Sequence, residues 1–200
     1  MSEPTVSSGW VPAGKRVDDL AAAHPDRPAI VFVPRTGVHR TVTWDELAKE
    51  SNRAARLLDE RGVGVGSLVV VALPNSVEHF VLSIAVWKLG GCVLPLNPAL
   101  PQWERDQIME IATPALVIGD FVGSGPSRTT VGALDLRWAD RSADPMPVRV
   151  ASPAGAVASG GSTGRPKIII QPGRRGGDPD VLPPVLRATD FRPGPTCSPR

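Results

Sequence analysis

The hydrophobic positions of this chain switch repeatedly between the spacing of a strand and the spacing of a helix. Short apolar runs bounded by turn residues predict strands, at Ala29–Val33, Thr41–Thr43, Leu68–Leu73, Cys92–Leu96, Ala115–Ile118, Ala154–Ala158 and Lys167–Ile170. Apolar residues three and four positions apart predict helices, at Val17–Ala23, from Thr43 to Gly62, from Asn75 or Ser76 to Gly90, and at Trp103–Ala112. The first two strands read as a hairpin. The alternation of the others predicts an α/β fold with a doubly wound, mostly parallel sheet flanked by helices.

Local signals support two of these helices. Thr43 is followed three residues later by Glu46, the pattern of a capping box. Asn75 or Ser76 can cap the next helix, because both side chains accept hydrogen bonds from free backbone N–H groups. A pair of glycines that begins at Gly90 ends that helix.

The pattern divides the chain into three parts. Residues 1–16 form a polar leader, and residues 17–171 carry the regular elements. Within that part, residues 120–153 are expected to form a connecting region with one short element. Residues 172–200 are rich in proline, glycine and arginine and lack apolar periodicity. Such a segment buries too little surface to offset its ordering entropy, so it is expected to be disordered or loosely attached.

Composition narrows the function classes. The net charge is only +2 and the basic residues are spread along the chain, which argues against nucleic-acid binding. Cys92 and Cys197 have no partner at metal-ligand spacing, so neither a metal site nor a disulfide framework is expected. No apolar stretch is long enough to cross a bilayer and no signal peptide is visible, so a cytoplasmic protein is expected.

A glycine-rich loop between two predicted strands carries the candidate chemistry. It runs through Ser159, Gly160, Gly161, Ser162, Thr163, Gly164, Arg165, Pro166 and Lys167. Glycines allow successive backbone N–H groups to converge on an anion, while hydroxyls and a lysine add further donors. The spacing does not fit a Walker A loop, because Arg165 and Pro166 separate Gly164 from Lys167. A flexible linker is the alternative, but its tight flanking by strands favours a phosphate-binding loop.

Three stretches in this order resemble the adenylate-forming superfamily, which includes acyl-CoA synthetases, peptide-synthetase adenylation domains and luciferases. The loop resembles its Thr-Gly-x-Pro-Lys signature. Val42–Leu47 resembles its Leu-Thr-Tyr-x-Glu-Leu stretch, and Trp87–Leu96 resembles its Lys-x-Gly-Ala-x-x-x-Pro-Leu stretch. The resemblance covers Val17 to Ile170 and identifies this part as the N-terminal, incomplete portion of the large domain of such an enzyme.

The resemblance implies an activity and its partners. In the family the loop closes over the β and γ phosphates of ATP, with Mg²⁺, while a carboxylic acid attacks the α-phosphorus. Coenzyme A then takes the acyl group as a thioester. The implied phosphate contacts are Ser159, Gly160, Gly161, Ser162, Thr163, Gly164 and Lys167, with Thr163, Gly164 and Lys167 the foremost. The two earlier stretches are structural in the family, and no catalytic or metal-binding residue is assigned.

The chain also departs from the family pattern. The family's aromatic-Gly-x-x-Glu and Thr-Gly-Asp stretches and its C-terminal lysine do not appear after Lys167. The chain alone is therefore expected to be inactive, as a truncated or frameshifted product or as a fragment that needs a partner. The alternative is a noncatalytic nucleotide-binding or interaction module. The acid and the acceptor thiol stay open, and an incomplete sheet edge predicts self-association.

Other candidate residues have simpler explanations. The glycines between Gly62 and Gly66 precede a strand and break the GxGxxG pattern at Ser67, so they are expected to form a turn. The three histidines have no Ser, Cys or Asp partner at a recognisable spacing, so surface or packing roles are expected for them; they are His24, His39 and His79.

Overall fold

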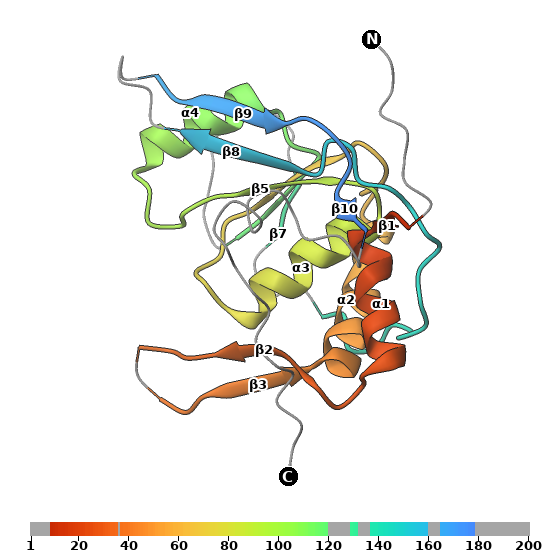
Figure 1. Ribbon diagram of the computed structural model, residues 1–200. Coiled ribbons are helices and arrows are strands. Elements are labelled where there is room, and N and C mark those ends of the chain that lie inside the picture. The colour runs from red at the N-terminus through yellow and green to blue at the C-terminus, as the bar shows by residue number, and fades with distance from the viewer. Residues whose placement is uncertain (1–8, 36, 120–128, 132–136, 160–164, 179–200) are drawn as a thin grey trace, which may run out of the picture.

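A computed structural model describes residues 9–35, 37–119, 129–131, 137–159 and 165–178, drawn in colour in Figure 1. The elements are β1 (Val11–Pro12), α1 (Ala13–Ala23), β2 (Pro28–Phe32), β3 (Arg40–Thr43), α2 (Trp44–Glu60), β4 (Leu68–Val71), α3 (Val77–Lys88), β5 (Cys92–Pro95), α4 (Gln102–Ala112), β6 (Leu116–Ile118), β7 (Thr129–Val131), β8 (Gly155–Ser159), β9 (Lys167–Gln171) and β10 (Gly176–Gly177). None of the described helices is long and apolar enough to cross a membrane.

The main sheet has six strands in the order β7-β6-β4-β5-β8-β9. All neighbours are parallel except the last pair, β8 and β9, which is antiparallel. From β4 the chain first crosses to β5 on one side and then returns to β6 on the other, so the topological switch point lies between β4 and β5. The predicted doubly wound, mostly parallel sheet is confirmed.

Helices cover both faces of this sheet. On one face α1, α2 and α3 pack over a core that contains Leu58, Leu82 and Val69. On the other face α4 packs with Val70 and other strand residues around Ile108. Neighbouring residues of one strand thus enter opposite cores because side chains alternate across a sheet. This explains why β4 reads as an unbroken apolar run.

The helix signals of the sequence act as predicted. The Thr43 hydroxyl accepts a hydrogen bond from Glu46 N (3.2 Å), and Thr43 N donates to the Glu46 carboxylate (2.8 Å), which completes the capping box of α2. Ser76 caps α3 by accepting from His79 N. After α3, Gly90 adopts a φ of 78°, a left-handed conformation that favours glycine. The sharp turn that follows leads directly into β5.

The two ends of the predicted domain differ from expectation. Helix α1 begins at Ala13, inside the predicted polar leader, and β1 precedes it. Strand β10 lies in the segment expected to be disordered, yet it pairs antiparallel with β1. Arg175 immediately precedes β10. Its guanidinium lies 4.7 Å from the Trp87 ring centroid, and its backbone carbonyl accepts a hydrogen bond from Ala13 N. These local pairings order residues up to 178, and residues 179–200 lie outside the described part.

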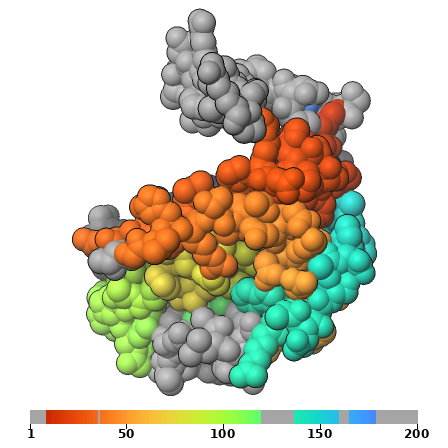
Figure 2. All heavy atoms as spheres, turned by 90° about the horizontal axis from the view of Figure 1, so that it is seen from below, coloured from red at the N-terminus to blue at the C-terminus, as the bar shows by residue number. Residues whose placement is uncertain are grey.

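The connection before β8 is held by side chains of α2. Figure 2 shows residues 137–153, in cyan, against the side of the molecule that α2 forms. Arg56 donates hydrogen bonds to Ser142 O and Asp144 O, and Trp138 Nε1 donates to the Glu50 carboxylate. The short element was expected near the apolar patch Val131–Trp138, of which residues 132–136 lie outside the described part, and β7 ends at Val131. The predicted hairpin of β2 and β3 is present.

Candidate phosphate-binding site

The candidate loop is the connection of a β-hairpin. Strands β8 and β9 pair over five residues, and the last pair toward the loop is Ser159 with Lys167. The prediction that the loop joins two strands is therefore confirmed. The structure describes both ends of the loop, whereas Gly160, Gly161, Ser162, Thr163 and Gly164 lie outside the described residues. The hairpin brings the Ser159 hydroxyl and the Lys167 ammonium to the same end of two paired strands.

The base of this hairpin is packed on the sheet. Pro166 is buried, and Ile168 packs with Ala158 against the core that α4 covers. Proline has a fixed φ, so its position just before β9 limits the directions in which the strand can leave the loop. The Lys167 side chain is exposed and makes no hydrogen bond or ion pair within the described part of the chain. The ammonium group is thus free to meet an anion.

The loop leaves the sheet at its carboxyl edge. Because β8 runs parallel to β5, with Gly155 opposite Val93, Ser159 ends β8 on the side where β5 ends at Pro95. Open α/β sheets bind ligands at this edge, close to the switch point. The position of the loop fits that rule.

A cavity of about 420 Å³ lies at the same edge, where β4 and β5 end. Its lining residues are Leu73, Pro74, Asn75, His79, Pro95, Leu96 and Asn97. Two of its polar side chains have local partners: Asn97 Oδ1 accepts from Ala99 N at 3.0 Å, and His79 Nδ1 lies 3.4 Å from Leu73 O. Sequence reasoning named Asn75 only as a possible helix cap, a role that Ser76 takes, and did not single out Asn97. The available signal was a polar residue after each strand beside the switch point.

The described residues supply no metal site of their own. No three His, Cys, Asp or Glu side chains come together among them. Cys92 is buried in the core, and burial raises the pKa of its thiol. Cys92 therefore packs in the core as a small apolar residue.

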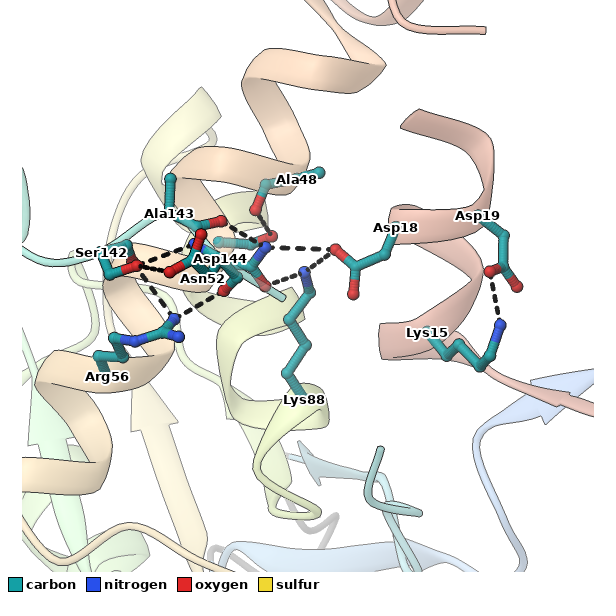
Figure 3. Close-up of polar contacts among 11 residues, drawn as sticks. Lys15, Asp18, Asp19, Ala48, Asn52, Arg56, Lys88, Ser142, Ala143 and Asp144 are labelled. Atoms are coloured by element: carbon teal, nitrogen blue, oxygen red, sulfur yellow. Dashed lines mark hydrogen bonds and ion pairs between the residues drawn. The ribbon is translucent and has the colours of Figure 1, made fainter. Parts of the chain in front are cut away.

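A second lysine, in the Trp87–Leu96 stretch, has a wholly different environment. The Lys88 ammonium lies 2.6 Å from Asp18 Oδ1 and donates to Asn52 Oδ1 at 2.5 Å, so it joins α1, α2 and α3 (Figure 3). Asn52 Nδ2 in turn donates to Ala143 O at 3.0 Å. Burial lowers the pKa of Lys88, and the hydrogen bond and charge of Asp18 oppose that shift. This lysine is structural.

Tight helix packing surrounds this network. A Cβ atom added at Gly14 would lie 2.8 Å from Lys88 Cγ, so α1 approaches α3 as closely as a glycine allows. The expectation that the two early stretches are structural thus has a physical basis in this chain. One supplies the capping box of α2, and the other supplies the buried cation that ties the three helices together. Sequence reasoning missed Lys88, since nothing in its spacing indicates that its partner is Asp18.

The fold and the loop together define an α/β domain with a glycine-rich hairpin at the carboxyl edge of a parallel sheet. The family model described as AMP-binding enzyme matches residues 17–172. The chain belongs to this family, whose members form adenylates, and the resemblance seen in the three stretches is confirmed.

Among similar proteins are the probable non-canonical nonribosomal peptide synthetase CymA of Salinispora arenicola and the dimodular nonribosomal peptide synthase of Bacillus subtilis. The first is 33% identical over 75% of this chain and 2% of its own length. The second is 33% identical over 64% of this chain and 6% of its own length. The chain thus spans only a small part of the curated relatives it matches.

Solved structures agree with the fold. The N-terminal domain of FACL13 from Mycobacterium tuberculosis, crystallised with an inhibitor, matches with a TM-score of 0.70 and 25% identity, over 80% of this chain and 44% of that one. The N-terminal subdomain of Klebsiella oxytoca NpsA in complex with 3-hydroxybenzoyl-AMSN matches with a TM-score of 0.67 and 24% identity, over 78% and 40%. The described elements therefore correspond to an N-terminal part of the large domain.

Proposed function

We propose that this chain supplies the phosphate-binding part of a carboxylate-activating, adenylate-forming enzyme. The observation that carries the proposal is the hairpin that sets Ser159 and Lys167 at the carboxyl edge of the sheet, at the two ends of a loop of glycines and hydroxyls. Converging backbone N–H groups and one exposed ammonium suit the β and γ phosphates of ATP.

The proposed reaction is the transfer of AMP to a carboxylic acid. A carboxylate oxygen attacks the α-phosphorus of ATP, the bond from that phosphorus to the bridging oxygen breaks, and pyrophosphate leaves. Residues Ser159 to Gly164 would hold the departing phosphates through backbone N–H groups and the hydroxyls of Ser159, Ser162 and Thr163. The Lys167 ammonium would balance the charge that grows on pyrophosphate. Mg²⁺ bound with ATP neutralises phosphate charge when present.

The second step is proposed to be thioester formation. Attack of a thiolate on the acyl carbon of the adenylate would release AMP. Coenzyme A is our first candidate for the acceptor, because a fatty acyl-CoA synthetase of Mycobacterium tuberculosis matches with a TM-score of 0.69, although at 24% identity. The peptide synthetases among the relatives support a carrier-protein thiol as the alternative.

The first experiment measures ATP binding by calorimetry. We expect micromolar affinity for ATP and its loss in Lys167→Ala, because the variant removes the exposed cation at the loop. Lys15→Ala is the matched control: it removes another exposed lysine, on α1, which pairs with Asp19. Equal binding by all three proteins, or no binding by any, would contradict the proposed role of the loop.

The second experiment separates an enzyme part from a binding module. The 200 residues lack the family's downstream ribose and magnesium motifs, so we expect no carboxylate-dependent exchange of pyrophosphate into ATP. A noncatalytic nucleotide-binding module is the competing function. Grafting residues 17–172 into a complete relative distinguishes the two. Restored exchange supports the enzyme, and binding without exchange supports the module. The outer edge of β9, with which no other described strand pairs, also supports self-association of the isolated chain.

A further inference from the structure

Strand β9 is the last strand of the six-stranded sheet. One of its edges pairs with β8, and no other described strand pairs with the opposite edge. Backbone N–H and C=O groups along such an edge need water or another strand as a partner. The strand also exposes much apolar surface, since Ile169 is 57% exposed, Ile170 55% and Val157 of β8 48%. Long apolar edges of this kind are usually interrupted by charge, yet β9 has a charge only at its first residue, Lys167.

The sequence of β9 is complementary to itself in the antiparallel direction. With Ile169 opposite its own copy, Ile168 lies opposite Ile170, and Lys167 lies opposite Gln171. No two like charges then face each other. A proline stands three residues from Ile169 on each side, at Pro166 and Pro172, and a proline cannot donate to a ladder. The strand is therefore bounded symmetrically.

Other registers are worse. A shift of two residues in either direction leaves three of the five strand residues paired. A shift in one direction places Lys167 opposite Ile169. A shift in the other direction places Gln171 opposite Ile169. Cross-strand pairs of β-branched residues stabilise a sheet, whereas a charged residue opposite an isoleucine gives up such a pair. The arrangement centred on Ile169 keeps all five residues paired and all isoleucines in contact with isoleucines.

We propose that the isolated chain forms a twofold dimer through antiparallel pairing of β9 with β9 of a second copy, centred on Ile169. The two six-stranded sheets become one continuous sheet. The inference rests on the self-association proposed above and specifies its strand, symmetry and register. The pairing includes Lys167, a proposed phosphate contact, but it uses the backbone of β9, so it can be tested without nucleotide.

The decisive experiment introduces a charge at the centre of the proposed interface and measures the molecular mass by sedimentation equilibrium. The wild-type chain is expected at twice 21.1 kDa. Ile169→Lys and Ile169→Glu should each be monomeric, because two equal charges would face each other, and an equimolar mixture should return to the dimer mass. Circular dichroism confirms folding of both variants, which alter an exposed side chain. A wild-type monomer, or a dimer that both variants retain, overturns the proposal.

Disulfide trapping tests the register. Opposite residues in antiparallel strands have Cα atoms about 4.5–5.5 Å apart, a distance that a disulfide can span. In a Cys197→Ser background, Ile169→Cys should form a covalent dimer under mild oxidation. Ile168→Cys mixed with Ile170→Cys should give the heterodimer ahead of either homodimer. Trapping of the homodimers instead would show a shifted register and overturn the assignment.

Two further outcomes are distinguishable. If the wild type is monomeric while the amides of β9 resist hydrogen exchange, residues of the same chain cover the edge and the dimer is excluded. ATP calorimetry of the Ile169→Lys monomer tests the loop separately, because Lys167 is unchanged there. Loss of the dimer with retained ATP binding leaves the proposed function intact, and loss of ATP binding in an intact dimer contradicts only that function.

Discussion

Two lysines of this chain show how one residue type takes opposite roles in the two halves of the fold. Lys88 is 2% exposed and meets both Asp18 and Asn52 within hydrogen-bonding distance (Figure 3). Lys167 is exposed at the end of a hairpin and meets no partner within the described residues. A cation with all its partners supplied by the fold is structural. A cation left without partners at the carboxyl edge of a sheet is available for a ligand.

The largest contrast should appear when apolar side chains are shortened in the two regions. Leu82 on α3 is 1% exposed within the core that also surrounds Lys88. Leu82→Ala should lower the free energy of unfolding by about 3 kcal/mol, because it removes buried methyl groups and leaves a cavity. Ile169→Ala changes a side chain on the exposed edge. Its free energy of unfolding in urea, measured at a protein concentration low enough to keep the chain monomeric, should fall by less than about 1 kcal/mol. Equal costs would show that the edge is buried.

The second prediction concerns the partner of Lys88. Asp18→Asn leaves the buried ammonium without its counter-ion, so the free energy of unfolding should fall by about 2–3 kcal/mol. Asp19→Asn is a matched control one residue further along α1. Asp19 pairs with Lys15 on the surface, and exposed pairs of this kind contribute about 0.3–0.5 kcal/mol. Similar losses in both variants would mean that the Lys88 network is solvated.

Lys88 should make the free energy of unfolding depend on pH. Burial lowers its pKa below the ordinary lysine value of 10.5 in the folded state. Between these two pKa values the unfolded chain binds more protons than the folded chain, so stability rises with pH in that window. Below the window both states are protonated and no slope is expected. Urea titrations should therefore show wild type gaining stability relative to Lys88→Met as the pH rises toward 10.5, and parallel profiles would contradict the assignment.

The sequence predicted the order of elements because hydrophobic period and helix caps are local properties. Thr43 with Glu46 and Ser76 before α3 were readable without tertiary information. The hydrogen-bond network of Lys88 could not be predicted, because its partners Asp18 and Asn52 lie on other helices, 70 and 36 residues away in the sequence. The pairing of β10 with β1 was also missed. Its residues, Gly176 and Gly177, carry no strand propensity and are placed by their partner strand and by Arg175 on Trp87.

The candidate site was predictable to a similar degree. The loop from Ser159 to Lys167 was identified from its glycines and its flanking strands, and its position between β8 and β9 is confirmed. The cavity beside it was not identified. Asn75 and Asn97 come together only because β4 and β5 are neighbours at the switch point, and the order of strands in a sheet is not encoded in the period of either strand.

A smaller effect should follow from breaking the capping box of α2. Thr43→Ala removes the hydroxyl that accepts from Glu46 N, so one backbone N–H at the helix start loses its partner. We expect a loss of about 1 kcal/mol in the free energy of unfolding, measured by urea denaturation. Thr43→Ser keeps the hydroxyl and serves as the control. A loss in Thr43→Ser as large as in Thr43→Ala would attribute the effect to the methyl group instead.

The smallest effect on stability should come from the lysine that matters most for binding. Lys167→Ala removes an exposed side chain without a partner in the described residues, so the free energy of unfolding should change by less than about 0.5 kcal/mol. Yet the same variant should lose ATP affinity, because it removes an exposed ammonium that the end of the hairpin presents to the phosphates. Lys88→Ala should do the reverse, with lower stability and unchanged affinity per folded molecule. A Lys167 variant that lost stability and binding together would place this lysine in the structural class and remove the contrast between the two halves of the fold.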